Sequence, residues 1–574
     1  MSINSLTIEG FKSFQEPSEM NFSKINLFFG ANSSGKSSAI QALMVLKQTS
    51  ESKSSQYDLL TNGKYANLGN ASDIINKNSN EAFSVKVAIG DLETNSNDIN
   101  ELSKEVKWSW KFSKSKNIIN NIRLNNLEIQ RDSNVDKFNY SEDKKIYINE
   151  DNNSAVKGIE ISNIIPDSIT LQYNIKYNVI MHGFLSDFYN IVNTDLKTSK
   201  WNKENAFQDE SQRITKCFMA IMKTGQETKK ETIINVTEGI KKFKKFCNAI
   251  CIKMFIPHEK LLLWSIMELL IYTFTKNEMK KLNAIIGKYD IQLKQVDKIN
   301  DGDFLKVSFK LGNSNMMLLS ESDNELHNAK NNLQETLKKI TYLGPIREIP
   351  KNMYEHDSDQ SPIYVGKNGQ YLPSILAYLP DWIVDSPLPN GEKVKDIKFI
   401  DALNKWMRYL GIADGIETSI TNFLSINVNN EGVVSNIVNV GVGVSQVLPV
   451  ISMGILSSKN DILIFEQPEL HLHPYAQSKL IDFFIALSNE GRQIIVESHS
   501  EYFLHRLRYK ILNNDIKKED VCVLFFNKTS DGTVVKKAEL GNMGNIEYPR
   551  GFKDTTEELI DEILKKQLER LKDE

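Results

Sequence analysis

Residues 30–38, GANSSGKSS, combine the residue types that bind phosphate groups. Gly30, Gly35, Lys36 and Ser37 fit the pattern G-x-x-x-x-G-K-[ST], between an apolar stretch and a predicted helix. In such a loop, backbone N–H groups surround the phosphates, and the helix N-terminus adds partial positive charge. Lys36 is expected to bind the β- and γ-phosphates of ATP, and Ser37 to bind Mg²⁺. The residues predicted to bind the nucleotide in this phosphate-binding loop are Gly30, Asn32, Ser33, Ser34, Gly35, Lys36, Ser37 and Ser38.

A second stretch, DILIFEQPELHLHP (461–474), places polar side chains at the end of a predicted strand. Glu466 follows four apolar residues and is expected to hold Mg²⁺ through water. The next residue is Gln467, whose amide can orient a water molecule but cannot accept its proton at neutral pH. Glu469 is the alternative base if the loop curls back. The sequence leaves open which of these two residues positions the attacking water, and it predicts slow hydrolysis.

The glycine-rich segment NVGVGVSQVLP (439–449) follows a predicted strand and opens a predicted helix. Gly443, Ser445 and Gln446 supply flexible backbone, a hydroxyl and an amide at a helix N-terminus, which together suit an anion. A tight turn with no ligand is the alternative. The segment lies just upstream of the Glu466 strand, a position that favours phosphate binding through the family resemblance described below.

Three histidines lie close to these segments. His499 ends the predicted strand of GRQIIVESHS (491–500), where it is either structural or a sensor of the γ-phosphate. His471 and His473 are two residues apart, but no cysteine or carboxylate follows at an established metal-ligand spacing. They are therefore expected to organise the loop after Glu466 and to line a dimer interface, with a metal pair as the alternative.

Alternating strands and helices must position these residues. The last third of the chain predicts a strand at 434–440, a loop at 441–445, a helix at 446–457, a strand at 461–466, a helix at 475–488 and a strand at 492–496. This alternation is typical of an α/β fold with a mixed, largely parallel sheet. A large, mostly helical insertion is expected to interrupt it. The predicted divisions are an N-terminal lobe (1–90), a helical or mixed insertion (91–335), a connecting part (336–435), a C-terminal lobe (436–540) and a tail helix (541–574).

Composition limits the class of protein. The chain has 574 residues, a formal net charge of −3 and 25% charged residues, which excludes a uniformly basic surface for nucleic acid. Four scattered cysteines predict no disulfide framework. With no signal-peptide pattern and no long apolar run, a cytoplasmic protein without a membrane partner is expected. A lysine-rich stretch at 229–245 predicts a solvated helix face, with a DNA or RNA contact as the alternative.

Taken together, the motifs resemble a known family. The segments IEGFKSF, GANSSGKSS, GVGVSQVLP, EQPELHLHP and VESHSEYFLHRLR are similar to those of bacterial stand-alone ABC-type, AAA-family ATPases of the OLD-like, RecF and Rad50/SMC group. YLGPIREIP (342–350) and GNIEYPRGF (544–552) resemble further blocks of one OLD-like subfamily. The resemblance covers roughly residues 1–90 and 340–555, and it implies the ABC-type head fold of P-loop NTPases. Only about 75 residues follow His499, too few for the TOPRIM nuclease domain of OLD nucleases.

The resemblance implies ATP and Mg²⁺ as cofactors and a homodimer, or a higher homo-oligomer, that closes around ATP. Each phosphate-binding loop would then face the glycine-rich segment of the other subunit, and His499 would sense the γ-phosphate. At Gln467 these ATPases usually carry a glutamate that activates water. The implied function is a sensor or regulator in anti-phage defence, acting with a separate effector such as a nuclease or toxin. The alternatives are a DNA-repair ATPase that binds DNA directly and a nucleotide-bound scaffold that does not hydrolyse ATP.

Overall fold

The computed structural model describes most of the residues before 177 and after 290. The described residues are 1–52, 58–91, 105–115, 122–131, 134–142, 146–151, 156–161, 164–176, 291–299, 304–311, 321–354, 364–391, 393–420, 423–541, 544–548, 562–563 and 565–567. They divide into two compact units. The first contains Met1–Asn152, Gly158–Asp167 and Glu325–Glu574, and the second contains Asn153–Lys157 and Ser168–Asn324.

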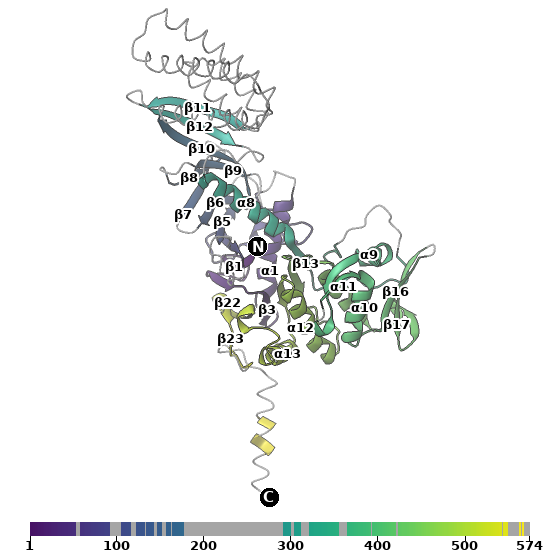
Figure 1. The fold of residues 1–574 in the computed structure, drawn as a ribbon. Helices are drawn as coiled ribbons and strands as arrows, with labels where there is room; N and C mark the ends of the chain where they lie inside the picture. The colour runs from purple at the N-terminus through teal and green to yellow at the C-terminus, as the bar shows by residue number, and fades with distance from the viewer. Residues whose placement is uncertain are drawn as a thin grey trace, which may run out of the picture. The chain divides into compact units, whose positions relative to one another are not determined.

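A six-stranded sheet forms the centre of the first unit (Figure 1). Its strands, in spatial order, are β13 (Ile340–Leu343), β19 (Ile462–Glu466), β20 (Gln493–Glu497), β3 (Ile25–Gly30), β21 (Val521–Thr529) and β22 (Gly532–Lys537). The first five are parallel, and β22 is antiparallel to β21. Every residue of β19 and β20 is buried, as expected for parallel strands covered on both faces. The mixed, largely parallel sheet of an α/β fold is therefore confirmed.

Helices lie next to the strands of this sheet in the sequence. Among them, α1 (Lys36–Glu51), α12 (Pro474–Asn489) and α13 (Glu501–Leu512) each come after a strand, and α11 (Val442–Leu456) comes before β19. Aromatic side chains fix α12 in place: the ring of Phe484 lies 5.1 Å from that of Phe465 in β19 and 6.2 Å from that of Phe503 in α13. Such ring contacts add to the burial energy of the core.

A further group of elements lies on one side of the first unit, drawn in green in Figure 1. It consists of α9 (Leu372–Tyr378), β14 (Ile383–Pro387), β15 (Lys393–Lys398), α10 (Phe399–Tyr409), β16 (Gly415–Ile420), β17 (Leu424–Asn430) and β18 (Val433–Asn436). Trp406 in α10 is buried and its ring lies 4.8 Å from that of Phe483 in α12. This contact joins the group to the helices that cover the central sheet.

A second sheet in the first unit is antiparallel throughout. Its strands within this unit are β2 (Ser18–Asn21), β1 (Ser2–Glu9), β4 (Ala82–Gly90), β5 (Val106–Lys114), β6 (Ile122–Arg131), β7 (Asn134–Ser141), β8 (Ile146–Asn149) and most of β9 (Val156–Ile161). In β5, buried residues alternate with more exposed ones, and Trp108 and Trp110 are fully buried. That period of two is the pattern of a strand with one face in the core.

The expectation of a mostly helical insertion therefore differs from the described part of 91–335, which is mainly strands. Besides β5 to β9 it contains β10 (Pro166–Lys176), β11 (Ile291–Ile299) and β12 (Phe304–Leu311), with β12 antiparallel to both others, and then the helix α8 (Glu321–Lys339). The cysteines Cys217, Cys247 and Cys251 and the lysine-rich stretch lie outside the described residues. So does most of the predicted tail helix.

The remaining elements are short. They are α2 (Ala71–Ile74), η3 (Pro389–Gly391), η4 (Ile437–Asn439), η5 (Lys518–Asp520), β23 (Glu539–Leu540) and β24 (Ile546–Glu547). Within the part of the chain that the structure describes, none of the helices has the length and apolar character needed to span a membrane.

Candidate functional site

The phosphate-binding loop connects β3 to α1, as the sequence predicts. Gly30 has φ 144° and Gly35 has φ 107°, which are backbone conformations that residues with a side chain rarely adopt. A Cβ atom on Gly30 would lie 2.2 Å from the carbonyl oxygen of Phe526, and one on Gly35 would lie 2.5 Å from Oγ1 of Thr533. Both glycines are therefore required by the close approach of β21 and β22.

Within this loop the side chains differ in exposure. Asn32 and Ser33 are exposed, Ser34 is buried and Ser38 is half-buried. Lys36 is only 3% exposed, and its Nζ donates hydrogen bonds to the carbonyl oxygens of Gly30 (2.8 Å) and Ala31 (2.9 Å). Burial lowers the pKa of Lys36, while the negative charges of Glu497 and Glu469 oppose that shift. A lysine in this position presents its charge inside the loop.

Ser37, the predicted Mg²⁺ ligand, contacts a carboxylate that the sequence analysis did not single out. Its Oγ lies 3.0 Å from Oε1 and 2.9 Å from Oε2 of Glu497, the last residue of β20. Because β19 and β20 are parallel neighbours, Glu497 stands directly opposite Glu466 in the register. The signal that could have found Glu497 is its position at the end of an apolar strand, two residues before His499.

Glu466 and Glu497 form a buried pair, 4% and 3% exposed. Burial and then the charge of Glu497 raise the pKa of Glu466, and burial likewise raises the pKa of Glu497. The hydroxyl of Tyr342 in β13 donates a hydrogen bond of 2.8 Å to Oε1 of Glu466 and opposes the shift there. Together, Ser37 and the two carboxylates offer the hard oxygen ligands that suit Mg²⁺.

The two candidates for positioning water lie in one turn after β19. Gln467 has φ 47°, and its backbone N–H donates a hydrogen bond of 2.7 Å to the carbonyl oxygen of Glu497. Glu469 is 6% exposed, and its Oε1 accepts hydrogen bonds from Ser498 Oγ (2.8 Å) and the backbone N–H of His499 (2.8 Å). Its other oxygen, Oε2, has no hydrogen-bond partner, and burial raises its pKa. The carboxylate is thus fixed through one oxygen, while the other is buried and unpaired.

The three predicted histidines differ in their surroundings. The side chain of His499 is exposed, and partial burial followed by the charge of Lys36 lowers its pKa. His473 precedes α12, and its Nδ1 accepts a hydrogen bond of 3.3 Å from the backbone N–H of Tyr475. Among the described residues, no group of three or more histidine, cysteine, aspartate or glutamate side chains is arranged to hold a metal by itself. His473 thus caps α12, and His471 is exposed with φ 62°.

The glycine-rich segment differs from its prediction in one respect. The helix α11 begins at Val442, so Gly443 and Ser445 belong to it, whereas the sequence predicts a loop up to residue 445. A Cβ atom on Gly443 would lie 2.8 Å from the carbonyl oxygen of His471, so the helix packs against the loop after Glu466. Ser445 is 7% exposed and its Oγ donates to the carbonyl oxygen of Val442 (2.8 Å), while Gln446 is half-buried.

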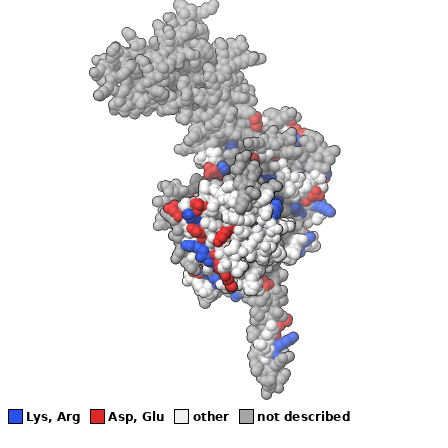
Figure 2. All heavy atoms as spheres, turned by 90° about the vertical axis from the view of Figure 1, so that its right-hand side faces the viewer, with Lys and Arg blue, Asp and Glu red and all other residues white. Residues whose placement is uncertain are grey.

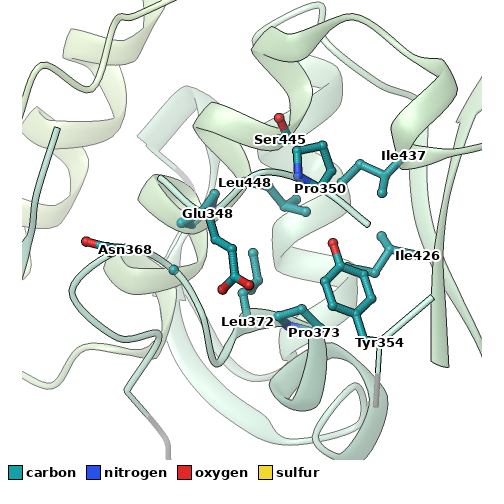
Figure 3. Close-up of a pocket in the computed structure, with 12 residues that line it drawn as sticks. Glu348, Pro350, Tyr354, Asn368, Leu372, Pro373, Ile426, Ile437, Ser445 and Leu448 are labelled. Carbon is teal, nitrogen blue, oxygen red and sulfur yellow. The ribbon is translucent and has the colours of Figure 1, made fainter. Parts of the chain in front are cut away.

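A pocket lies behind the first turns of α11 (Figure 3). Ser445 and Leu448 line it from the helix, and Glu348 and Tyr354 line it from the loop after β13. The same loop is held to its surroundings by backbone bonds, such as that from the N–H of Glu348 to the carbonyl oxygen of Asn368 (2.8 Å). One loop therefore contacts both the glycine-rich segment and, through Arg347, the turn at Gln467.

Comparison with solved structures finds distant likenesses. Among solved structures, an SMC head domain from Thermotoga maritima is 10% identical, with 94% of this chain and 100% of that chain covered and a TM-score of 0.33. An Smc head domain derived from Pyrococcus furiosus, with an extended coiled coil and bound to the C-terminal domain of ScpA, is 12% identical, with 93% and 96% covered and a TM-score of 0.33. Likenesses at this TM-score carry no argument about function.

Sequence comparison is more informative. None of the curated proteins matches the chain significantly. The family described as AAA ATPase domain matches residues 1–504, which is most of the chain and includes the phosphate-binding loop, Glu466, Glu497 and His499. The chain therefore belongs to the AAA ATPase domain family.

Proposed function

We propose that this protein binds ATP with Mg²⁺ at the cluster of Lys36, Ser37, Glu466 and Glu497 and hydrolyses the ATP slowly. The observation that carries the proposal is the contact of Ser37 Oγ with both oxygens of Glu497, beside Glu466 and the phosphate-binding loop. A serine hydroxyl and two strand-end carboxylates lie next to a buried lysine. Together they form an oxygen-rich site at the N-terminus of α1.

Different residues bind the phosphates and the metal ion. Backbone N–H groups of the phosphate-binding loop and Nζ of Lys36 bind the phosphates, and Lys36 leaves the carbonyl oxygens of Gly30 and Ala31 to do so. Ser37, Glu466 and Glu497 would hold Mg²⁺, which when bound would supply positive charge next to the phosphate oxygens. Tyr342 holds Glu466 in place through its hydrogen bond.

Glu469 is the residue best placed to take the proton of the attacking water. Its Oε1 is held by Ser498 and His499, so its orientation is fixed, and its Oε2 is buried without a hydrogen-bond partner. Gln467 orients water or shapes the turn but cannot accept the proton. Turnover is slow in this proposal because Gln467 stands where the ATPases that the motifs resemble usually carry the glutamate that activates water. A long-lived ATP-bound state follows, and this suits a switch.

In this proposal two copies close around ATP, with Gly443, Ser445 and Gln446 of one facing the phosphates bound by the other. The exposed His499 then senses the γ-phosphate. A role as a sensor or regulator in anti-phage defence, with a separate effector, is supported by the resemblance of the motifs. The rival, direct DNA binding, draws no support from the face shown in Figure 2, where acidic and basic side chains of the described residues are mixed around a broad uncharged area.

The binding part of the proposal is tested by calorimetry of ATP with Mg²⁺ on the wild type and Lys36→Ala. The wild type is expected to bind and the variant to lose binding, because the loop loses its buried cation. Lys24→Ala is the matched control, since Lys24 is 3.3 Å from Asp520 in a surface ion pair away from the loop. Unchanged affinity in Lys36→Ala would show that nucleotide is not bound by this loop.

A further inference from the structure

Arg347 is a buried cation to which the sequence motifs assign no role. It lies in the loop between β13 and α9 and is 4% exposed. Its neighbours in the loop, Ile346 and Ile349, are 79% and 80% exposed. The loop therefore directs an arginine inward while it leaves two apolar side chains in solvent. Burying a charged group carries a large desolvation penalty, so the inward position of Arg347 costs free energy of folding. That cost indicates that the buried guanidinium has a functional role.

Only one of the three guanidinium nitrogens of Arg347 is hydrogen-bonded. Nη1 donates hydrogen bonds to the carbonyl oxygens of Pro345 (2.8 Å) and Gln467 (3.3 Å). Nε and Nη2 are buried and have no hydrogen-bond partner, and Oε2 of Glu469 is in the same condition. Burial lowers the pKa of Arg347 to about 10, and the charges of Glu469 and then Glu466 oppose the shift. Arg347 thus lies among the carboxylates of the nucleotide site with two donors unused.

A second buried arginine shows what a purely structural role looks like in this protein. Arg492 is also 4% exposed. Its Nε donates to Ser457 Oγ (2.8 Å), and its Nη2 donates to the carbonyl oxygens of Ser457 (2.6 Å) and Asp385 (3.4 Å). The nitrogens that Arg347 leaves free are those that Arg492 uses to join elements of the core.

We propose that Arg347 is a positioning residue for ATP hydrolysis: Nη1 holds the turn at Gln467, and Nε and Nη2 face Glu469 as its counter-charge. The proposal rests on the proposed function. Gln467 has φ 47°, a strained conformation for a residue with a side chain, and the bond to its carbonyl oxygen helps to maintain it. Through that turn, Arg347 sets where the carboxylate of Glu469 stands relative to the phosphate-binding loop, while the ATP itself is held by other residues.

The test separates positioning from folding. We compare ATP hydrolysis and Mg²⁺-ATP binding in the wild type, Arg347→Ala, Arg347→Lys and the matched control Arg492→Ala, with and without added guanidinium. Loss of a charge-assisted hydrogen bond at this position is expected to lower kcat in Arg347→Ala by about 10- to 100-fold. The affinity for ATP should stay within about threefold, because Arg347 contributes no phosphate ligand. Guanidinium should restore part of kcat in Arg347→Ala only.

Each other outcome overturns the inference. A wild-type kcat in Arg347→Ala would remove any role in hydrolysis. A loss of kcat that guanidinium does not restore, or an equal loss in Arg492→Ala, would show that Arg347 acts only through the fold. If Arg347→Ala does not fold, Arg347→Lys decides, since it keeps the charge but lacks the planar fork, and wild-type turnover in it would also refute the inference. A wild type that neither binds nor hydrolyses ATP would instead refute the proposed function.

Discussion

At the scale of single residues, the site is defined by an imbalance of buried charge. Glu466, Glu469 and Glu497 are 4%, 6% and 3% exposed, and the buried cations beside them are Lys36 and Arg347. In both cations, burial lowers the pKa, and in all three carboxyls it raises the pKa. The site thus holds more acidic than basic groups, and a divalent cation would supply the missing positive charge.

The first prediction concerns the base. Glu469→Gln should lower kcat by about 10²- to 10⁴-fold, the range typical for loss of a general base. Gln467→Glu should raise kcat, because it adds a second carboxylate in the same turn. Steady-state phosphate release from the wild type and the two variants measures both effects. Wild-type turnover in Glu469→Gln would exclude this residue as the base and leave Gln467 as the residue that positions water.

The second prediction concerns pH and stability without Mg²⁺. The folded state holds the pKa of Glu466 and Glu497 above the ordinary value of 4.5, so it binds more protons than the unfolded state above that pH. The free energy of unfolding should therefore fall as the pH rises from about 5 to about 8. Urea denaturation across this range measures the slope, and Glu497→Gln should flatten it. A slope that is identical in this variant would contradict the raised pKa values.

At the scale of elements, a feature could be predicted from the sequence when a contiguous motif encodes it, and could not when it depends on packing between distant segments. The phosphate-binding loop and the Glu466 strand were predictable, because each is a contiguous motif next to a strand or helix. Glu497 was not, since its importance arises only from the parallel register that places it opposite Glu466. Arg347 was likewise visible within YLGPIREIP, but its inward direction depends on packing between distant segments.

In the antiparallel strands, the alternating pattern of a strand was present in the sequence, but the composition of the region was given more weight. In VKWSWKFSK, the sequence of β5, apolar residues alternate with polar ones, which favours a strand. The high content of lysine and asparagine around it favoured loops and helices instead. In the glycine-rich segment the reverse happened: the glycines favoured a loop, whereas α11 already includes Gly443, whose missing side chain permits close contact with the loop after Glu466.

The third prediction belongs to α11. Ser445→Arg should prevent association of two copies in the presence of ATP, because a large cation in the first turns of the helix would obstruct the proposed partner site. Ser445 is buried, so a smaller variant, Ser445→Ala, is the control for loss of the hydroxyl alone. Sedimentation with and without ATP measures association, and circular dichroism checks that each variant is folded. ATP-dependent association that persists in Ser445→Arg would show that this segment does not face a second copy.

At the scale of the whole molecule, the central sheet joins segments from both ends of the sequence. β3 lies between β20 and β21, so Ile25 pairs with Ile494 on one side and with Val521 on the other. Asn26 strengthens the junction, since its Nδ2 donates hydrogen bonds to the carbonyl oxygens of Ser23 (2.8 Å) and Ile494 (3.1 Å). The nucleotide site is a product of this arrangement, because Ser37 comes from the early segment and its carboxylate partner from the late one.

The position of β3 has a consequence for synthesis on the ribosome. When INLFFG leaves the exit tunnel, neither neighbour of this apolar strand has been made, and both of its edges are unpaired. At about 5–20 residues per second, the late strands follow only after roughly half a minute to a minute and a half. During that time the strand is a site for aggregation or for capture by a chaperone. A nascent chain that ends before Glu497 therefore contains the phosphate-binding loop but lacks the carboxylate that contacts Ser37.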